Sequence, residues 1–257
     1  MKIAEVNKKD FMLDLTKTTY PAKEIRVKRK SIAAELCRRS ENINGGNIKL
    51  ISTADLELLF GLYDRIFFED WFENNFKGRF KFSLSRRMTR SAGKTISPKN
   101  IAKVKAEDLV LEIRISVELL FKYDMLGGHK SVAGISTKNN LEALQVVFEH
   151  ELCHIIELLC FKESNCSKDR FKSIATNLFG HSESHHKLPT TKLVAQQKYG
   201  FRIGDAVSFI CDGKKFKGVI SNINKRATIM VVDLNGTYAD QQGKRYSKYY
   251  VPLGLLK

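Results

Sequence analysis

Apolar positions in the middle of the chain recur at the spacing of amphipathic helices. A helix capped by Ser52 or Thr53 is predicted to present one apolar face, made of Leu56, Leu59, Phe60, Tyr63, Ile66 and Phe67. The same periodicity predicts helices over residues 141–161, 169–179 and 190–199. Gly180 and Gly200 follow the last two, where a left-handed C-cap is expected.

Apolar and polar residues alternate in two other regions, which is typical of strands. Residues 80–84 and 108–117 are predicted strands, and residues 42–47 form a predicted linker. After Gly200, short apolar runs at 206–210, 217–221 and 227–232 are separated by turn pairs such as Asp212-Gly213. The pattern predicts an α+β chain in three parts: a weakly structured N-terminal arm over 1–50, a mixed domain over 51–199 and a small all-β barrel over 200–257.

Composition limits the classes of function and the cellular compartments that the sequence allows. The 257 residues include 44 Lys and Arg against 28 Asp and Glu, a formal net charge of +16, which favours a polyanion such as nucleic acid as partner. Hydrophobic residues make up 43%, enough for a core. We find no apolar run of the ~18 residues that span a bilayer and no apolar signal segment near Met1. Five scattered cysteines do not indicate a disulfide framework, so a reducing, cytoplasmic compartment is expected.

A metal-binding motif lies inside the predicted helix 141–161. His150-Glu151-Leu152-Cys153-His154 has the form HExxH. Histidines four residues apart stand one helical turn apart, so both imidazoles can reach one Zn²⁺, with Glu151 beside them as general base for a zinc-bound water. The surrounding helix is apolar, and buried imidazoles need partners, which a metal ion supplies. We therefore predict His150 and His154 as zinc ligands and Glu151 as the catalytic residue.

A catalytic zinc ion takes a third protein ligand, which the sequence places downstream. His181, just after the capping Gly180, is the first candidate; His186 is the second and His185 the third. Cys166 is a softer alternative, because zinc also accepts thiolate.

Together these motifs resemble the SprT-like zinc metalloprotease family, whose eukaryotic members include Spartan. The similarity spans roughly residues 52–190 and is carried by Ser85-Arg86-Arg87-Met88-Thr89-Arg90-Ser91-Ala92-Gly93, the strand near 109–117 and the HExxH helix. The resemblance implies a zincin-like fold, with the HExxH helix beside a small antiparallel sheet, and proteolysis of proteins attached to DNA. Family members usually place the third ligand in an H-G-x-x-F segment, whereas here Phe171 is preceded by Ser167-Lys168-Asp169-Arg170.

Basic residues flank this motif on both sides. The stretch 23–39 is rich in Lys and Arg, and Arg86, Arg87 and Arg90 are candidate phosphate ligands. Residues 201–257 mix basic side chains with aromatic ones and resemble Tudor- or KOW-type barrels. We expect nucleic-acid contacts there from Lys214, Lys215, Lys225 and Arg226. The predicted strand 109–117 is a candidate edge for pairing with a substrate peptide.

The sequence thus leads to two main hypotheses and a third, a metalloprotease whose basic surface serves RNA or a ribosome-associated substrate. The first is a zinc endopeptidase that acts on DNA-bound proteins, with DNA, in single-stranded form, as a partner and no membrane association. The alternative is a zinc-stabilised nucleic-acid-binding protein without proteolytic activity, in which four protein ligands close the metal shell.

Overall fold

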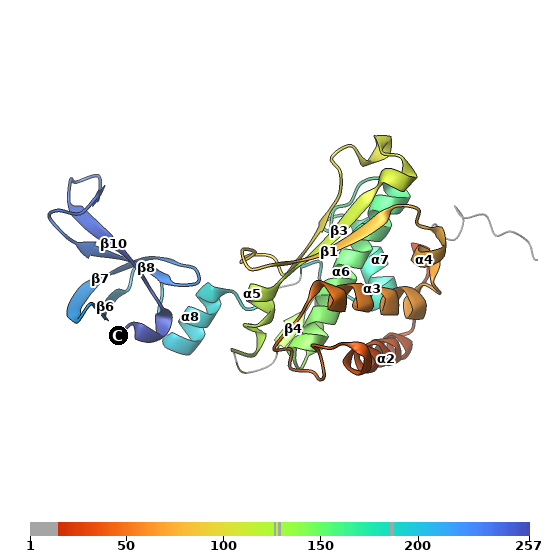
Figure 1. Ribbon diagram of the computed structural model, residues 1–257, viewed down its shortest axis with the longest axis horizontal. Coiled ribbons are helices and arrows are strands. Elements are labelled where there is room, and N and C mark those ends of the chain that lie inside the picture. Colours follow the sequence, from red (N-terminus) through yellow and green to blue (C-terminus); the bar gives the residue numbers. More distant parts are fainter. Residues whose placement is uncertain (1–14, 126, 128–129, 186–187) are drawn as a thin grey trace, which may run out of the picture. The chain divides into compact units, whose positions relative to one another are not determined.

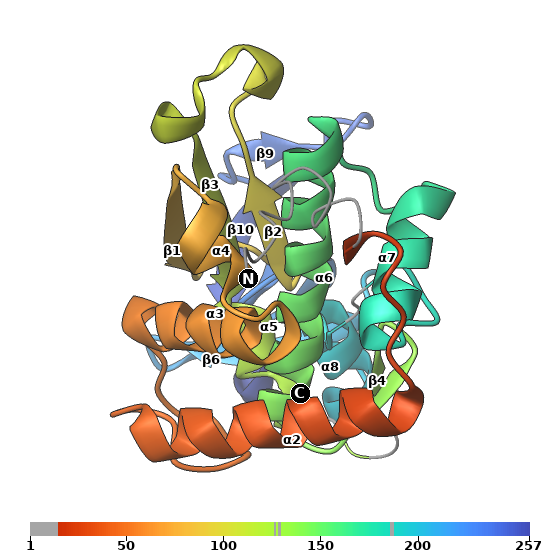
Figure 2. The same ribbon diagram turned by 90° about the vertical axis from the view of Figure 1, so that its right-hand side faces the viewer.

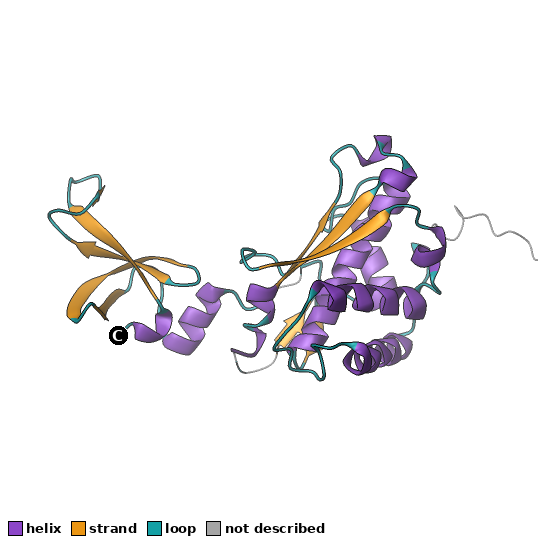
Figure 3. Ribbon diagram, in the orientation of Figure 1, coloured by secondary structure: helices purple, strands orange, loops and turns teal. Residues whose placement is uncertain are grey.

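The computed structural model describes residues 15–125, 127, 130–185 and 188–257, and they form an α+β structure in two compact units. Figure 1 shows the order of the elements along the chain, and Figure 3 shows that helices dominate the first unit and strands the second. Apart from a short piece at 125–127, the second unit runs from Pro189 to Lys257, whereas the sequence pattern placed the boundary at residue 200. The helix over 191–199 belongs to the second unit because Val194 and Ala195 are buried, Ala195 in that unit's core.

Helices surround a small sheet in the first unit. They are α2 (Ala22–Arg39), α3 (Thr53–Phe67), α4 (Trp71–Asn75), α5 (Val117–Leu120), α6 (Asn140–Phe161) and α7 (Asp169–Phe179). Of the two predicted capping residues, Ser52 caps α3, and it does so in a reciprocal capping box with Asp55. Gly180 ends α7 in the left-handed conformation, at φ 67°.

Within the predicted weakly structured arm, residues 22–39 form a helix, which the apolar spacing of the basic stretch allows. Ile25, Ile32 and Leu36 of α2 are buried, and α2 packs against α3 and α6 at the base of the first unit (Figure 2). Its apolar positions are few, but their spacing gives one narrow buried stripe. Most of the basic side chains lie on the rest of the helix, which explains why the stretch looks polar in sequence. Residues 1–14 lie outside the described ranges.

The main sheet of the first unit is mixed. Its strands are β1 (Arg79–Ser85), β2 (Gly93–Ile96) and β3 (Val110–Ser116), in the order β1-β3-β2. β1 pairs with β3 in parallel, so the expectation of a purely antiparallel sheet is wrong, and only β2 runs antiparallel to β3. α3 packs against β1, and α6 packs against β2 (Figure 2).

Strand β3 lies at the centre of this sheet and not at its edge. Leu111, Ile113 and Ile115 are fully buried, as a strand with neighbours on both sides requires. The expected role of residues 109–117 as a substrate-pairing edge is therefore incorrect. β2, which lies between the two predicted strands in sequence and was not itself predicted, is the edge strand on the side of α6. A short hairpin of β4 (Lys130–Val132) and β5 (Ile135–Thr137) completes the strands of the first unit.

The second unit combines α8 (Thr191–Tyr199) with a five-stranded antiparallel sheet. The strands are β6 (Ala206–Cys211), β7 (Lys214–Ile223), β8 (Ala227–Val232), β9 (Tyr238–Ala239) and β10 (Arg245–Val251), in the order β6-β7-β8-β10-β9. In the described residues, β6 and β9 stay unpaired with each other, so the sheet is open where a closed barrel was predicted. The backbone of Lys257 exchanges two hydrogen bonds of 2.9 Å with Ser208 and extends the sheet beyond β6.

Each unit has its own apolar core. The first is built around α6 and the inner faces of α3 and β3, and the second around Val207, Phe209 and Ile229. Across the described ranges, no helix combines the length and apolar character that a membrane crossing requires.

Candidate metal centre

Helix α6 carries both histidines of the HExxH motif on one face, as predicted. The helix is capped by Asn139 and is apolar and buried through most of its length, which fixes the directions of its side chains. His150 and His154 approach each other closely, with 3.2 Å between their Nε2 atoms. Both rings pack on Phe171 of α7, at centroid distances of 4.7 and 4.5 Å.

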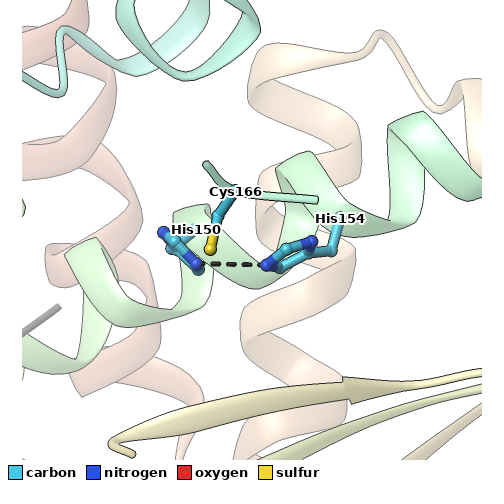
Figure 4. A group of neighbouring side chains, drawn as sticks. All are labelled: His150, His154 and Cys166. Carbon is cyan, nitrogen blue, oxygen red and sulfur yellow. Dashed lines mark hydrogen bonds between the residues drawn. The ribbon is translucent and has the colours of Figure 1, made fainter. Parts of the chain in front are cut away.

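The third potential ligand is Cys166, from the loop that joins α6 to α7. One ligand atom from each of His150, His154 and Cys166 lies within 4.8 Å of the others. Figure 4 shows the sulfur of Cys166 turned toward the gap between the two imidazole rings. Cys166 immediately precedes the Ser167–Arg170 stretch before Phe171, which is the region where the SprT-like pattern expects a histidine.

The structure does not bring His181, the first-ranked third ligand, to this group. The αL turn at Gly180 directs the chain back toward α6, but to a different face of the helix, where His181 Nε2 lies 3.0 Å from Glu149 Oε2. Residues 149 and 150 are adjacent on a helix and point about 100° apart, so His181 cannot serve both. His186, the second candidate, lies outside the described residues. His185 lines the same cavity as the metal group without joining it.

A chain of polar contacts orients His154 from behind. Ser164 Oγ lies 2.6 Å from His154 Nδ1 and donates a hydrogen bond of 2.6 Å to the buried carboxylate of Glu157. Arg170 Nε donates to the other oxygen of Glu157 at 2.8 Å. With Nδ1 engaged by Ser164, Nε2 of His154 is directed at the group in Figure 4. Outer partners of this kind fix the ring orientation of metal-binding histidines.

Glu151 points into the same space and is held by strand β2. Thr95 Oγ1 donates a hydrogen bond of 2.7 Å to Glu151 Oε2. Gly93 leaves the room for this carboxylate, because a Cβ atom there would stand 2.5 Å from Glu151 Oε1. Ser91 Oγ donates to the carbonyl of Gly93 at 2.5 Å and fixes the start of the strand.

A cavity of about 610 Å³ opens over these side chains. The residues of β2 and the preceding loop line one side, α6 and the loop after it line another, and Ser184 and His185 complete it. Arg90 and Lys94 bring positive charge to its rim. Burial raises the pKa of the Cys166 thiol, and the carboxylates of Glu151 and Glu157 add to this effect. A bound divalent cation would act in the opposite direction and favour the thiolate.

Comparison with models of known protein families, with curated proteins and with solved structures found no match. The resemblance to SprT-like proteases therefore stays a prediction that rests on the residues of this chain.

The candidate nucleic-acid residues are exposed and are divided between the two units. Arg86, Arg87 and Arg90 lie in the loop between β1 and β2, and Arg90 alone of the three lines the cavity. In the second unit, Lys214 and Lys215 begin β7, and the basic pair Lys225-Arg226 lies in the turn after it. These four side chains are exposed at the two ends of one strand.

Sequence reasoning missed a buried charge network next to the metal group. Arg29 of α2 donates two hydrogen bonds, of 2.7 and 2.6 Å, to the fully buried carboxylate of Glu149. Tyr63 donates to the same carboxylate at 2.8 Å, and His181 contacts it from the other side. Burial alone would raise the pKa of Glu149, but Arg29 and His181 outweigh it and lower that pKa. The signal in the sequence was Glu149 itself, a carboxylate inside an apolar helix that needs a partner.

Proposed function

We propose that this protein is a zinc-dependent endopeptidase that acts on DNA-associated proteins. The observation that carries the proposal is the convergence of His150, His154 and Cys166 with the carboxylate of Glu151 on one cavity beside a sheet edge. A zincin-like active site of the SprT type combines two helix histidines, a glutamate and a third histidine. In this chain we assign the third position to the thiolate of Cys166.

The donor set fits zinc. Two imidazole nitrogens and a cysteine sulfur are borderline-soft ligands, which suit Zn²⁺ and do not suit Ca²⁺ or Mg²⁺. Three protein ligands leave one position of a tetrahedral shell for water, as in catalytic zinc sites. A bound zinc ion would lower the pKa of that water toward ~7 and polarise a peptide carbonyl.

Glu151 would move the proton. Its carboxylate lies on the motif helix between the two histidines in sequence, and the 2.7 Å bond from Thr95 sets its orientation. We assign to it the acceptance of the proton from the attacking water and its delivery to the leaving amine.

Strand β2 would hold the substrate. Ser116 N–H donates to the carbonyl of Ala92 at 2.8 Å, so by alternation Gly93 and Thr95 turn their backbone groups away from β3. A peptide in extended conformation can pair with this open edge, alongside the cavity. The basic side chains of Arg90 and Lys94 at the rim would then face either the substrate or the DNA that carries it.

The test compares wild-type protein with Glu151→Gln and with the matched control Glu107→Gln, whose side chain is exposed in the first unit. We expect one zinc per chain in all three proteins. Cleavage of a DNA-bound protein, stimulated by single-stranded DNA, should fall by about 10²–10⁴-fold only in Glu151→Gln, the range typical of a lost general base. Full cleavage by Glu151→Gln with zinc bound would refute the mechanism.

One observation favours a second candidate function, a zinc-stabilised nucleic-acid-binding protein without proteolysis. His185 lines the cavity of the metal group, so a fourth protein ligand is near at hand. X-ray absorption spectroscopy of the zinc-loaded protein separates the two. Three protein ligands plus one light oxygen scatterer support the protease, and a closed shell of four protein ligands supports the alternative.

A further inference from the structure

The second unit presents one face of its sheet to solvent. Strand residues alternate between faces, so Val207, Phe209 and Ile229 fill the core while their neighbours point outward. The register places Val219 opposite Met230 and Met230 opposite Lys248, in one row across three strands. We call this surface the outer face, and define it by Lys215, Lys217, Lys248, Tyr238, Tyr246 and Tyr250.

The outer face combines exposed rings with exposed apolar side chains. Tyr250 is 62% exposed and Tyr238 is 44% exposed, and Val219 and Val232 are exposed beside them. Lys248 Nζ stands 3.7 Å from the centroid of the Tyr238 ring, which fixes that ring by a cation–π contact. Tyr246 is anchored through its hydroxyl, which donates a 2.9 Å hydrogen bond to Asp240. Because these contacts already restrict the rings, little further side-chain entropy would be lost when a ligand binds to them.

The charged side chains that the strands carry on this face are all basic. The five strands of the sheet contain no Asp or Glu. Of the four aspartates of the second unit, Asp205 lies just before β6, and Asp212, Asp233 and Asp240 lie in turns between strands, Asp240 within reach of the Tyr246 hydroxyl. Lys215 and Lys217 are exposed on β7, and Lys217 lines a shallow groove of about 440 Å³ with Ala206, Ser208 and Val219. The surface is therefore complementary to a polyanion.

We infer that the outer face binds single-stranded DNA, with unpaired bases stacked on the tyrosine rings and phosphates held by the three lysines. Tyr246, Lys248 and Tyr250 occupy alternate positions of β10, about 6.6–6.8 Å apart, a spacing that suits successive nucleotides of an extended strand. This inference deepens the DNA part of the proposed function by naming where a strand would lie.

A single strand fits this face better than a duplex. Ring faces and exposed valines contact the flat surfaces of bases, and in a duplex those surfaces are covered by base stacking. The rows of side chains on a sheet of this kind supply no helix or ribbon projecting into a major groove. We commit to DNA over RNA because the proposed function acts at DNA; the tyrosine hydroxyls of this face could also bond a 2′-hydroxyl, so RNA is an arm of the test.

The test measures binding of a fluorescent 20-nucleotide oligo-dT to the full chain in a Glu151→Gln background without added zinc. Tyr238→Ala with Tyr250→Ala should weaken binding by about tenfold or more, since each stacked base contributes substantially. Tyr250→Phe should bind like the parent because the ring is kept. Tyr199→Ala is the matched control, an exposed tyrosine of α8 that also lies near a lysine.

Salt dependence tests the lysines. The triple change Lys215→Gln, Lys217→Gln and Lys248→Gln should lower the slope of log K against log salt by about 2, at ~0.7 per phosphate. Its control is Lys192→Gln, Lys198→Gln and Arg202→Gln, an equal loss of exposed charge in the same unit. A control slope that falls as much would refute the assignment of the phosphates to the outer face.

Three results would overturn the inference: equal binding by the double alanine variant and Tyr199→Ala, duplex binding as tight as that of the single strand, or an RNA oligo-U that binds tenfold more tightly. Circular dichroism of every variant checks that the sheet is intact. Because binding is measured without catalysis, its failure is distinct from failure of the protease proposal, which the cleavage assay decides.

Discussion

Cys166 is the residue on which the identity of the metal centre depends. Its sulfur faces His150 and His154, while His181 faces Glu149. A thiolate is a stronger donor to zinc than the water that would otherwise fill its place. If the group holds zinc, Cys166 supplies a third protein ligand without His181.

We therefore expect opposite outcomes from two substitutions. Cys166→Ala should weaken zinc binding by more than the ~10–100-fold typical of lost outer partners, because it removes a ligand outright. His181→Asn should keep one zinc per chain, since its imidazole serves the buried carboxylate of Glu149. Competition with a chromogenic chelator measures both affinities. If Cys166→Ala binds zinc with normal affinity and His181→Asn loses zinc, the ligands are His150, His154 and His181, as the sequence predicted.

The element that brings the site together is β2, a strand of four residues. It connects the sheet to α6 through the bond from Thr95 to Glu151, and it leaves an open edge over the cavity. Its first residue must be small, because Glu151 occupies the space where a side chain would begin.

Gly93→Ala should therefore reduce cleavage while leaving the metal ligands in place. The new Cβ atom would meet Glu151 Oε1 at 2.5 Å and force the carboxylate from its position. We expect a large loss of cleavage, comparable to that of Glu151→Gln, with zinc stoichiometry unchanged. Gly61→Ala is the matched control, since a Cβ atom in that helical position meets nothing within 4 Å and should stabilise α3 by about 1 kcal/mol. Equal cleavage activity in both variants would show that cleavage does not depend on the exact position of the Glu151 carboxylate.

The spacing of apolar residues predicted those helices whose formation depends on neighbouring residues alone. The bounds of α7 and the helix that carries the HExxH motif follow from apolar spacing and caps. β2 was missed because its four residues are too few to show an alternating pattern, and only its pairing with β3 and packing on α6 make it a strand. The parallel pairing of β1 with β3 and the approach of Cys166 to the histidines are long-range results of chain topology, which neither alternation nor spacing encodes.

At the scale of the whole molecule, positive charge has two different roles. Much of it is exposed on α2, in the loop before β2 and on the second unit. Arg29 differs, because it is half-buried and joins α2 to α6 through Glu149 and to the end of α7 through the carbonyl of Phe179. The predicted basic arm is thus partly a structural element of the first unit, and its charge is not all available to DNA.

Arg29→Met should lower the free energy of unfolding of the first unit by about 3–5 kcal/mol, because it leaves the carboxylate of Glu149 buried without its cation. Arg26→Met is the matched control, on the same helix but exposed, and should change stability by no more than about 0.5 kcal/mol. Trp71 is the single tryptophan of the chain and lies in α4, so its fluorescence during urea titration reports on the first unit. Equal stability of the two variants would show that the network holds Glu149 in place without stabilising the fold. A deficit confined to Arg29→Met, with single-stranded DNA binding unchanged, would separate the structural charge of this chain from the charge that we assign to nucleic acid.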